Sequence, residues 1–444
     1  MPVDLPMSDA ASDLILAEDG SLVRRSILPG GVRLLTETDT SVRSVSIGMW
    51  LPVGSRDESA PHAGSTHVLE HLLFKGTARR SALDIAQAFD EVGGESNAVT
   101  AKEHTFYYGR VRSADLPLAV DVLADMITSA TLAPEALATE REVILEELAM
   151  AEDDPTDVGY ETFLAQVLGP DTALGRPVGG TAETVGAISA ADVRDHYAEH
   201  YRPANLVVTA VGDLDHDALA ALLGQRLADG GWQLADGATP DPRRPDGEDP
   251  APGAGDAAAL VPLRLARDTE QTHVYLGGPG ITATSGERHV MSVLMSILGG
   301  GMSSRLFQHI REERGLAYSV YSFSAGYRGA GLFGLYAACR PSRTAQVVEL
   351  MAAELTAMGR DGVTEDEMRR ALGQITGSLA LGLEDTSSRM GRLGTAELVH
   401  GRYTDVDEAV ARFASVRAGD VQDLAARLAS SFTTRVDVGP ADAA

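Results

Sequence analysis

The sequence of 444 residues contains an internal duplication, and this feature constrains the fold more than any other. The strand-like run VSIG at 45–48 is answered by VYLG at 274–277, which lies 229 positions later. An apolar helical face that starts at Val120 recurs from Val348, and TLAPEAL from Thr131 is answered by GVTEDEM from Gly362. Because the offset stays nearly constant, the sequence predicts two copies of one structural unit.

Each copy reads as a strand, a helix, two strands, two helices and a late strand, which in the first copy is LVVTAVGDL at 206–214. The segments 105–112 and 331–340 alternate with a period of two, as is typical of antiparallel strands. We therefore predict an α+β fold of two tandem homologous α/β sandwich domains. Each would have a mostly antiparallel sheet with helices packed on it, and together they would form a clamshell.

A run rich in proline, glycine and aspartate separates the two copies. It predicts an exposed linker at 230–256, with one domain at 20–229 and the homologous domain at 257–444.

Charge and cysteine content narrow the class of protein. Acidic residues number 64 and basic residues 37, so the net charge of -27 argues against nucleic acid or an anionic membrane surface as a partner. With one cysteine, Cys339, the chain can form no internal disulfide, which fits a reducing compartment. The N-terminus lacks the pattern of a secretory signal, and no apolar run is long enough to span a bilayer. We predict a soluble, cytoplasmic protein.

The run GSTHVLEHLLF from Gly64 carries the candidate chemistry. It predicts a helix that is capped by its opening Ser/Thr pair. His67 and His71 are at i and i+4 on this helix, so both imidazoles can bind one Zn²⁺ ion. Glu70 lies beside them and can face a water molecule without binding the metal, in the H-x-x-E-H order of one group of metallopeptidases. The alternative is that two histidines fall at helical spacing by chance.

A catalytic zinc needs a third protein ligand, and the helix predicted from Pro134 offers two candidates. Glu140 and Glu147 are seven residues apart and share a face with apolar residues, where a carboxylate is costly to bury without a cation. The alternative is a solvated acidic face. His104, His196 and His200 show no ligand spacing and are interpreted as structural or surface residues.

These residues match a known family. GSTHVLEHLLFKGT, followed by Glu147 in EREVILEEL, resembles the pitrilysin/insulinase family of zinc peptidases. The branch that it resembles contains the catalytic subunit of the mitochondrial processing peptidase and its bacterial relatives. The resemblance implies a zinc endopeptidase that hydrolyses unfolded peptides or presequence-like segments inside an enclosed chamber. It also implies His67, His71 and Glu147 as metal ligands, Glu70 as general base and Glu140 as a supporting carboxylate.

The resemblance extends to substrate contacts. It implies that Asn97 and Ala98, in the edge-strand segment ESNAVTAKEHTFYY, contact the peptide backbone. Arg311 and Tyr318, in LGGGMSSRLFQHIREERGLAYSVYS, would steady the substrate carbonyl and the tetrahedral intermediate. The glycines at 299–301 resemble a substrate-capture loop. A phosphate cradle is the alternative there, but the Gly-Lys-Ser/Thr ending of such loops is missing.

The duplication predicts that the second copy binds no metal, because the positions matching the motif and Glu147 are occupied by Met295, Leu298, Gly299 and Ser378. It would be a non-catalytic domain that contributes Arg311 and Tyr318. The resemblance implies a homodimer, or a heterodimer with a homologous subunit. Two alternatives remain: a non-proteolytic scaffold or chaperone-like subunit of a heteromeric processing peptidase, and a metal-dependent hydrolase of another small amide.

Overall fold

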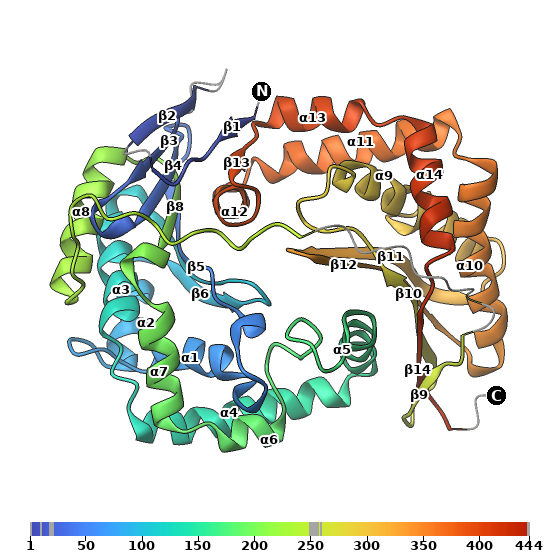
Figure 1. Cartoon of the computed structure of the whole chain (residues 1–444), viewed down its shortest axis with the longest axis horizontal. Coiled ribbons are helices and arrows are strands. Elements are labelled where there is room, and N and C mark those ends of the chain that lie inside the picture. Colours follow the sequence, from blue (N-terminus) through green and yellow to red (C-terminus); the bar gives the residue numbers. More distant parts are fainter. Residues whose placement is uncertain (1, 9–10, 17–21, 248–256, 258–259, 442–444) are drawn as a thin grey trace. The chain divides into compact units, whose positions relative to one another are not determined.

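The computed structural model describes residues 2–8, 11–16, 22–247, 257 and 260–441 (Figure 1). The chain divides into two compact units. Unit 1 comprises residues 1–148, 176–244 and 381–405, and unit 2 comprises residues 149–175, 245–380 and 406–444.

Unit 1 is built on a seven-stranded sheet in the order β2-β3-β4-β8-β5-β7-β6. All neighbours pair antiparallel except β4 and β8, which are parallel. The strand bounds are β2 (Ala11–Leu16), β3 (Leu22–Ile27), β4 (Arg33–Thr38), β5 (Ser44–Leu51), β6 (Glu95–Thr100), β7 (Thr105–Arg112) and β8 (Val207–Gly212). A separate pair joins β1 (Val3–Asp4) to β13 (Arg402–Tyr403).

Unit 2 repeats this architecture with five strands in the order β9-β14-β10-β12-β11. That order matches β4-β8-β5-β7-β6 of unit 1, and its one parallel pair, β14 with β9, has the same place. The bounds are β9 (Leu263–Ala266), β10 (Thr272–Pro279), β11 (Ala317–Tyr327), β12 (Ala330–Cys339) and β14 (Thr434–Gly439). The duplication and the mostly antiparallel sheets are therefore confirmed.

Helices cover the sheets as the apolar periodicity predicts. On α3 (Leu116–Ser129) the predicted face is fully buried at Val120, and on α10 (Thr344–Asp361) it is buried at Val348 and Leu355. Apart from α5 and α12, which are described below, the other α-helices of the described residues are α1 (Ser65–Leu73), α2 (Ala82–Asp90), α4 (Pro134–Asp153), α6 (Ala182–Ala187), α7 (Ala190–His200), α8 (His216–Asp229), α9 (Arg288–Gly299), α11 (Glu365–Gly382), α13 (Val406–Ala414) and α14 (Ala418–Ala429).

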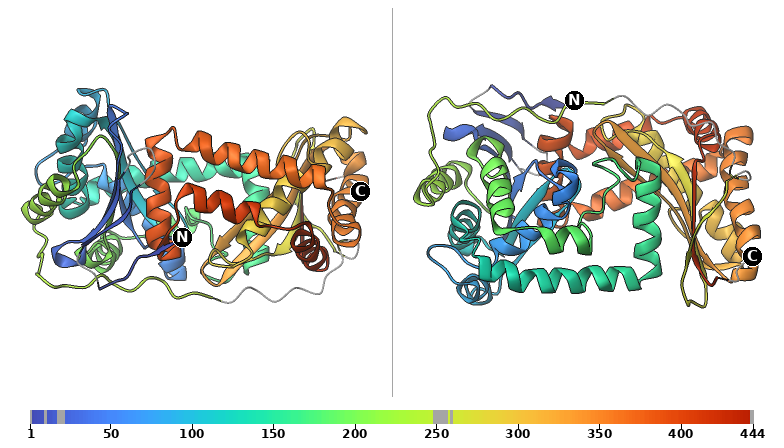
Figure 2. Two further views of the ribbon diagram at one scale, coloured as in Figure 1. Left: turned by 90° about the horizontal axis from the view of Figure 1, so that it is seen from above. Right: turned by 60° about the horizontal axis from the view of Figure 1, so that its bottom comes forward.

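Two helices pack on the sheet of the other half of the chain. Helix α5 (Pro155–Leu168), from the first half, contacts β10, β12 and β14 of unit 2. Helix α12 (Thr386–Thr395), from the second half, contacts β4, β5 and β8 of unit 1 and lies beside them in Figure 2. The sequence did not predict this exchange. The domain limits at 229 and 257 and the clamshell stay predictions, and residues 248–256 of the predicted linker lie outside the described residues.

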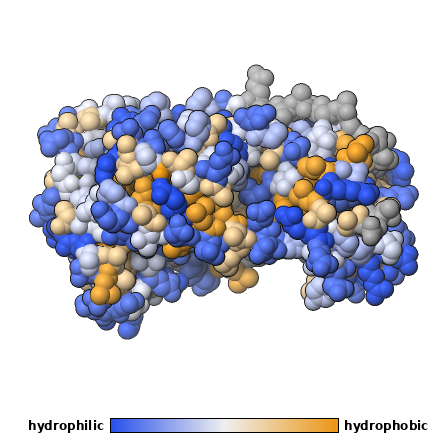
Figure 3. All heavy atoms as spheres, turned by 90° about the horizontal axis from the view of Figure 1, so that it is seen from below, coloured by the Kyte–Doolittle hydropathy of each residue, from blue (hydrophilic) through white to orange (hydrophobic). Residues whose placement is uncertain are grey.

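Hydrophilic residues surround smaller apolar patches on the face shown in Figure 3. Among the described residues, none of the helices has the length and apolar character that crossing a membrane requires.

Candidate metal centre and active site

The N-terminus of α1 is capped differently from the sequence prediction, which was wrong about the capping residue. Gly64 is the N-cap, in a left-handed conformation with φ of 96°, while Ser65 and Thr66 lie inside the helix. The carboxylate of Glu58 accepts hydrogen bonds from the backbone N–H groups of Gly64 and Thr66, at 2.8 and 2.6 Å. The carboxyl group of a preceding loop residue thus accepts the hydrogen bonds that a capping hydroxyl accepts elsewhere.

Glu58 is itself buried and anchored. Burial raises the pKa of its carboxyl to about 7, although the hydrogen bonds from Thr66 and Gly64 and the charge of Arg176 act in the opposite direction. The Arg176 guanidinium donates to the Glu58 carbonyl oxygen at 2.6 Å, and Lys102 Nζ donates to the Arg176 carbonyl oxygen at 2.8 Å. These contacts fix the start of the helix that carries both motif histidines.

Three predicted ligands come together. His67 and His71 of α1 and Glu147 of α4 offer ligand atoms that all lie within 4.8 Å of one another, the one such group among the described residues. Glu147 Oε2 is 3.5 Å from His71 Nε2 and 3.9 Å from His67 Nε2. Burial, with a smaller effect of His71, lowers the pKa of His67 and so favours the neutral imidazole that binds a metal. Two imidazoles and one carboxylate fit a catalytic zinc that keeps one open position.

The two glutamates of α4 have different environments. Glu140 is 4% exposed, and its Oε2 is 3.1 Å from His71 Nδ1, while its Oε1 is 2.8 Å from Lys75 Nζ. The side chain of Glu147 is 48% exposed. A solvated acidic face therefore does not describe Glu140, which lies directly behind one of the candidate ligands.

Glu70 lies in the same cleft, and sequence reasoning missed its partner. The Thr100 hydroxyl, at the end of β6, donates a hydrogen bond to Glu70 Oε2. Thr100 falls in the segment singled out as an edge strand, but its contact with α1 follows from the packing of β6 on that helix and not from a sequence pattern. This bond holds the carboxylate in place and leaves its other oxygen available to accept a proton.

Strand β6 is the last strand of the sheet, so it has the position that the sequence predicts for peptide binding. Asn97 lines the cleft, and its Oδ1 accepts the Ala98 N–H at 2.8 Å. Ala98 is 8% exposed and its side chain belongs to the core, so it can offer a peptide only its backbone. The substrate contacts of both residues stay predictions.

The cleft measures about 630 Å³ and is open to solvent. Its lining residues are His67, Glu70, His71, Phe74, Lys75, Ala82, Ile85, Ala86, Ser96, Asn97, Glu140 and Glu147.

Arg311 and Tyr318 lie together in unit 2. The Arg311 guanidinium stands 4.5 Å from the ring centres of both Phe307 and Tyr318, in a cation–π sandwich. Tyr318 is 73% exposed. The pair is therefore preformed and accessible, while its role toward the candidate metal site stays a prediction. Met295 and Leu298, which replace motif residues in the second copy, are buried in the core of unit 2.

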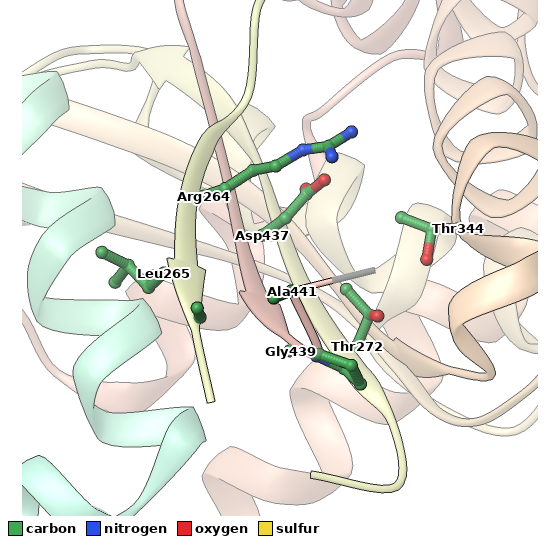
Figure 4. Close-up of a pocket in the computed structure, with 9 residues that line it drawn as sticks. Arg264, Leu265, Thr272, Thr344, Asp437, Gly439 and Ala441 are labelled. Atoms are coloured by element: carbon green, nitrogen blue, oxygen red, sulfur yellow. The ribbon is translucent and has the colours of Figure 1, made fainter. Parts of the chain in front are cut away.

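A second pocket, of about 150 Å³, lies in unit 2 near the end of β14 (Figure 4). Its carboxylate, Asp437, is already bound by the Arg435 guanidinium at 2.9 and 2.6 Å. Arg264 and the hydroxyls of Thr272 and Thr344 complete its polar lining, and among the described residues no cluster of three possible metal ligands lies there. The chemistry is concentrated in the cleft of unit 1.

A duplicated α+β chain that carries H-x-x-E-H on a helix and a third ligand on a later helix has the architecture of an inverted-motif metallopeptidase. The sequence profile of the insulinase family, peptidase family M16, matches residues 33–182, and that of the M16 inactive domain matches residues 187–375. The chain belongs to peptidase family M16.

Its relatives carry matching names. The chain is 49% identical over 432 residues to an uncharacterized zinc protease of Streptomyces coelicolor, covering 96% of this chain and 92% of the relative. It is 34% identical over 407 residues to one of Bacillus subtilis, with 92% and 96% covered. A solved M16 inactive-domain structure from Pseudomonas fluorescens shares the fold with a TM-score of 0.82 and 20% identity, covering 94% of this chain and 98% of that one. A protease from Helicobacter pylori aligns with a TM-score of 0.80, at 20% identity and with 94% and 99% covered.

Proposed function

We propose that this protein is a zinc-dependent endopeptidase that hydrolyses unfolded peptides or presequence-like segments inside an enclosed chamber. The convergence of His67, His71 and Glu147 beside Glu70 in one open cleft carries this proposal. The names of the relatives, which are called zinc proteases, support zinc as the metal.

The residues of the cleft are proposed to have three separate roles: metal binding, proton transfer and orientation of a ligand. His67, His71 and Glu147 would hold zinc, which when bound supplies a Lewis acid that polarises a carbonyl and acidifies water. Glu70, steadied by Thr100, accepts a proton from the attacking water and returns it to the leaving amine. Glu140 accepts the Nδ1–H of His71 and so directs Nε2 of that ring toward the metal position.

The substrate would add to β6 as a further strand, taking affinity from main-chain hydrogen bonds. The apolar wall formed by Phe74, Ala82 and Ile85 suits an apolar side chain near the scissile bond. Arg311 and Tyr318 are proposed to donate to the substrate carbonyl as negative charge develops on it. An extended mode of binding would favour unfolded chains over folded ones as substrates.

The test is cleavage of a quenched, unstructured peptide library by the purified protein, with and without a chelator and with zinc restored. Glu70→Gln should retain one metal per chain and lose at least about 100-fold in kcat, the lower range for a lost general base. Glu135→Gln, on the exposed first turn of α4, is the control and should cleave normally.

Two outcomes would contradict the proposal. Full turnover by a metal-loaded Glu70→Gln variant would remove Glu70 from the reaction. A wild-type protein that binds one zinc and cleaves nothing would favour the scaffold or chaperone-like subunit. We further propose a homodimer, or a heterodimer with a homologous subunit, and light scattering of the purified chain distinguishes the homodimer from a monomer.

A further inference from the structure

Lysine is almost absent from this chain. Of its 37 basic residues, only Lys75 and Lys102 are lysines, and the remaining positions use arginine. Lysine and arginine are not interchangeable where the geometry of a contact matters, because one is a compact charge and the other a planar fork. Lys75 lines the candidate active-site cleft.

Lys75 begins a chain of contacts that ends at a candidate metal ligand. It follows the C-terminus of α1, and its Nζ is 2.8 Å from Glu140 Oε1. The other oxygen of Glu140, Oε2, is 3.1 Å from His71 Nδ1. Each carboxylate oxygen therefore has its own partner. Because Glu140 is 4% exposed, its charge would be costly to bury without a cation.

The geometry explains why an ammonium group suits this place. A guanidinium presents a planar fork that binds both oxygens of a carboxylate at once. Such a fork at position 75 would compete with His71 for Glu140 Oε2. An ammonium group is a compact charge that can bind Oε1 alone, and it leaves Oε2 to the imidazole.

The two motif histidines differ in their contacts, and only His71 is bound by Glu140. The buried Nδ1 of His67 has no hydrogen-bond partner in the part of the chain that the structure describes. Of the two imidazoles, His71 is thus the one whose ring orientation is set by a carboxylate.

We propose that Lys75 is a positioning residue that fixes Glu140 and thereby holds His71 with Nε2 directed at the metal position. The inference rests on the proposed metal site, but it concerns metal affinity, which is measured without any peptidase assay. Failure of the proposed peptidase activity would therefore leave this test intact.

The experiment compares the zinc affinity of the purified full-length protein and its variants by competition with a chromogenic chelator. Lys75→Met should weaken zinc binding by about 10- to 100-fold, the usual loss when the support of a ligand is removed. Lys75→Arg should show a similar loss, since the charge is kept but the geometry is not. Arg112→Met, which removes an exposed cation paired with Asp115 at 2.7 Å, is the matched control and should bind zinc as the wild type does.

A double-mutant cycle separates positioning from a general effect on folding. In a Glu140→Gln background, Lys75→Met should weaken zinc binding by less than about 2-fold, because the effect of Lys75 on the metal site passes through Glu140. Circular dichroism and thermal unfolding establish that each variant is folded. Wild-type zinc affinity in Lys75→Met would overturn the proposal, and so would a full additional loss in the Glu140→Gln background. Wild-type affinity in Lys75→Arg would overturn the requirement for lysine.

Discussion

Glu58, just before α1, binds the N-terminus of that helix although burial of its ionised carboxylate is unfavourable. Glu58 satisfies two backbone N–H groups that the helix itself leaves unpaired. Those bonds favour the ionised carboxylate, while burial disfavours it more strongly and raises its pKa to about 7. The sequence pattern did not indicate this residue, because its partners are backbone groups of a later segment and no side-chain spacing marks them.

The raised pKa of Glu58 predicts how pH acts on folding. An ordinary glutamate in the unfolded chain has a pKa near 4.3, so between about pH 4.5 and 7 the native state binds more protons at this site than the unfolded state. Its contribution to stability is therefore fully present below about pH 4.5 and is lost as pH rises through 7, with a total on the order of 3 kcal/mol.

Glu58→Gln should remove this part of the pH dependence. Urea unfolding at several pH values from 4.5 to 8, with a chelator present, measures the free energy of unfolding of both proteins. We expect the free energy of unfolding of the variant to increase relative to that of the wild type as pH rises from about 4.5 to 7. Glu349→Gln, at an exposed position of α10, is the control. Parallel curves for Glu58→Gln and wild type would show that Glu58 has the same pKa in both states.

Among the secondary-structure elements, α12 shows most clearly what periodicity predicts and what it omits. An amphipathic pattern indicates that one face of a helix is buried, but it does not indicate which sheet covers that face. Strands and helices within each copy, such as β5, β7 and α3, were predictable from alternation and apolar spacing. The packing of α12 on β5 and β8 was not, since it joins segments more than 170 residues apart.

Small residues allow α12 to approach the sheet closely. A Cβ atom built on Gly394 would lie 2.6 Å from the ring of Trp50, whereas a Cβ on Gly391 of the same helix meets nothing within 4 Å. Gly394→Ala should therefore destabilise the protein by about 1–3 kcal/mol through overpacking. Gly391→Ala should be neutral or stabilising by up to about 1 kcal/mol, because alanine favours the helix.

Urea unfolding followed by tryptophan fluorescence measures both variants, since Trp50 is one of only two tryptophans. The pair is matched in helix, substitution and added volume, and it differs in the contact with Trp50. Equal stabilities of the two variants would contradict close packing of α12 on the sheet.

Considered as a whole molecule, the chain contributes to each unit from both of its halves. Glu397, two residues after the end of α12, is fully buried in unit 1, where the guanidinium of Arg25 donates to it at 2.9 Å and that of Arg33 lies 3.5 Å away. In unit 2, Phe163 of α5 is fully buried, with its ring centre 6.0 Å from that of Tyr275. The ligands of the candidate site were predictable because they belong to one motif and one helix spacing, whereas these long-range contacts follow no local pattern.

This exchange predicts that the two halves of the chain do not fold separately. Fragment 1–247 lacks α12 and Glu397, so Arg25 and Arg33 would stay buried without their carboxylate, at a cost of several kcal/mol. Fragment 248–444 lacks α5, so Tyr275 and Tyr336 on its sheet would be uncovered.

Each fragment alone should be poorly ordered by circular dichroism and sensitive to protease. Mixed after denaturation, the two should form a 1:1 complex that binds zinc. The intact chain, folded first and then cut at a protease site inserted at 248, is the control and should remain associated. A fragment 1–247 that unfolds cooperatively and binds zinc with wild-type affinity would show that the exchanged helix is dispensable.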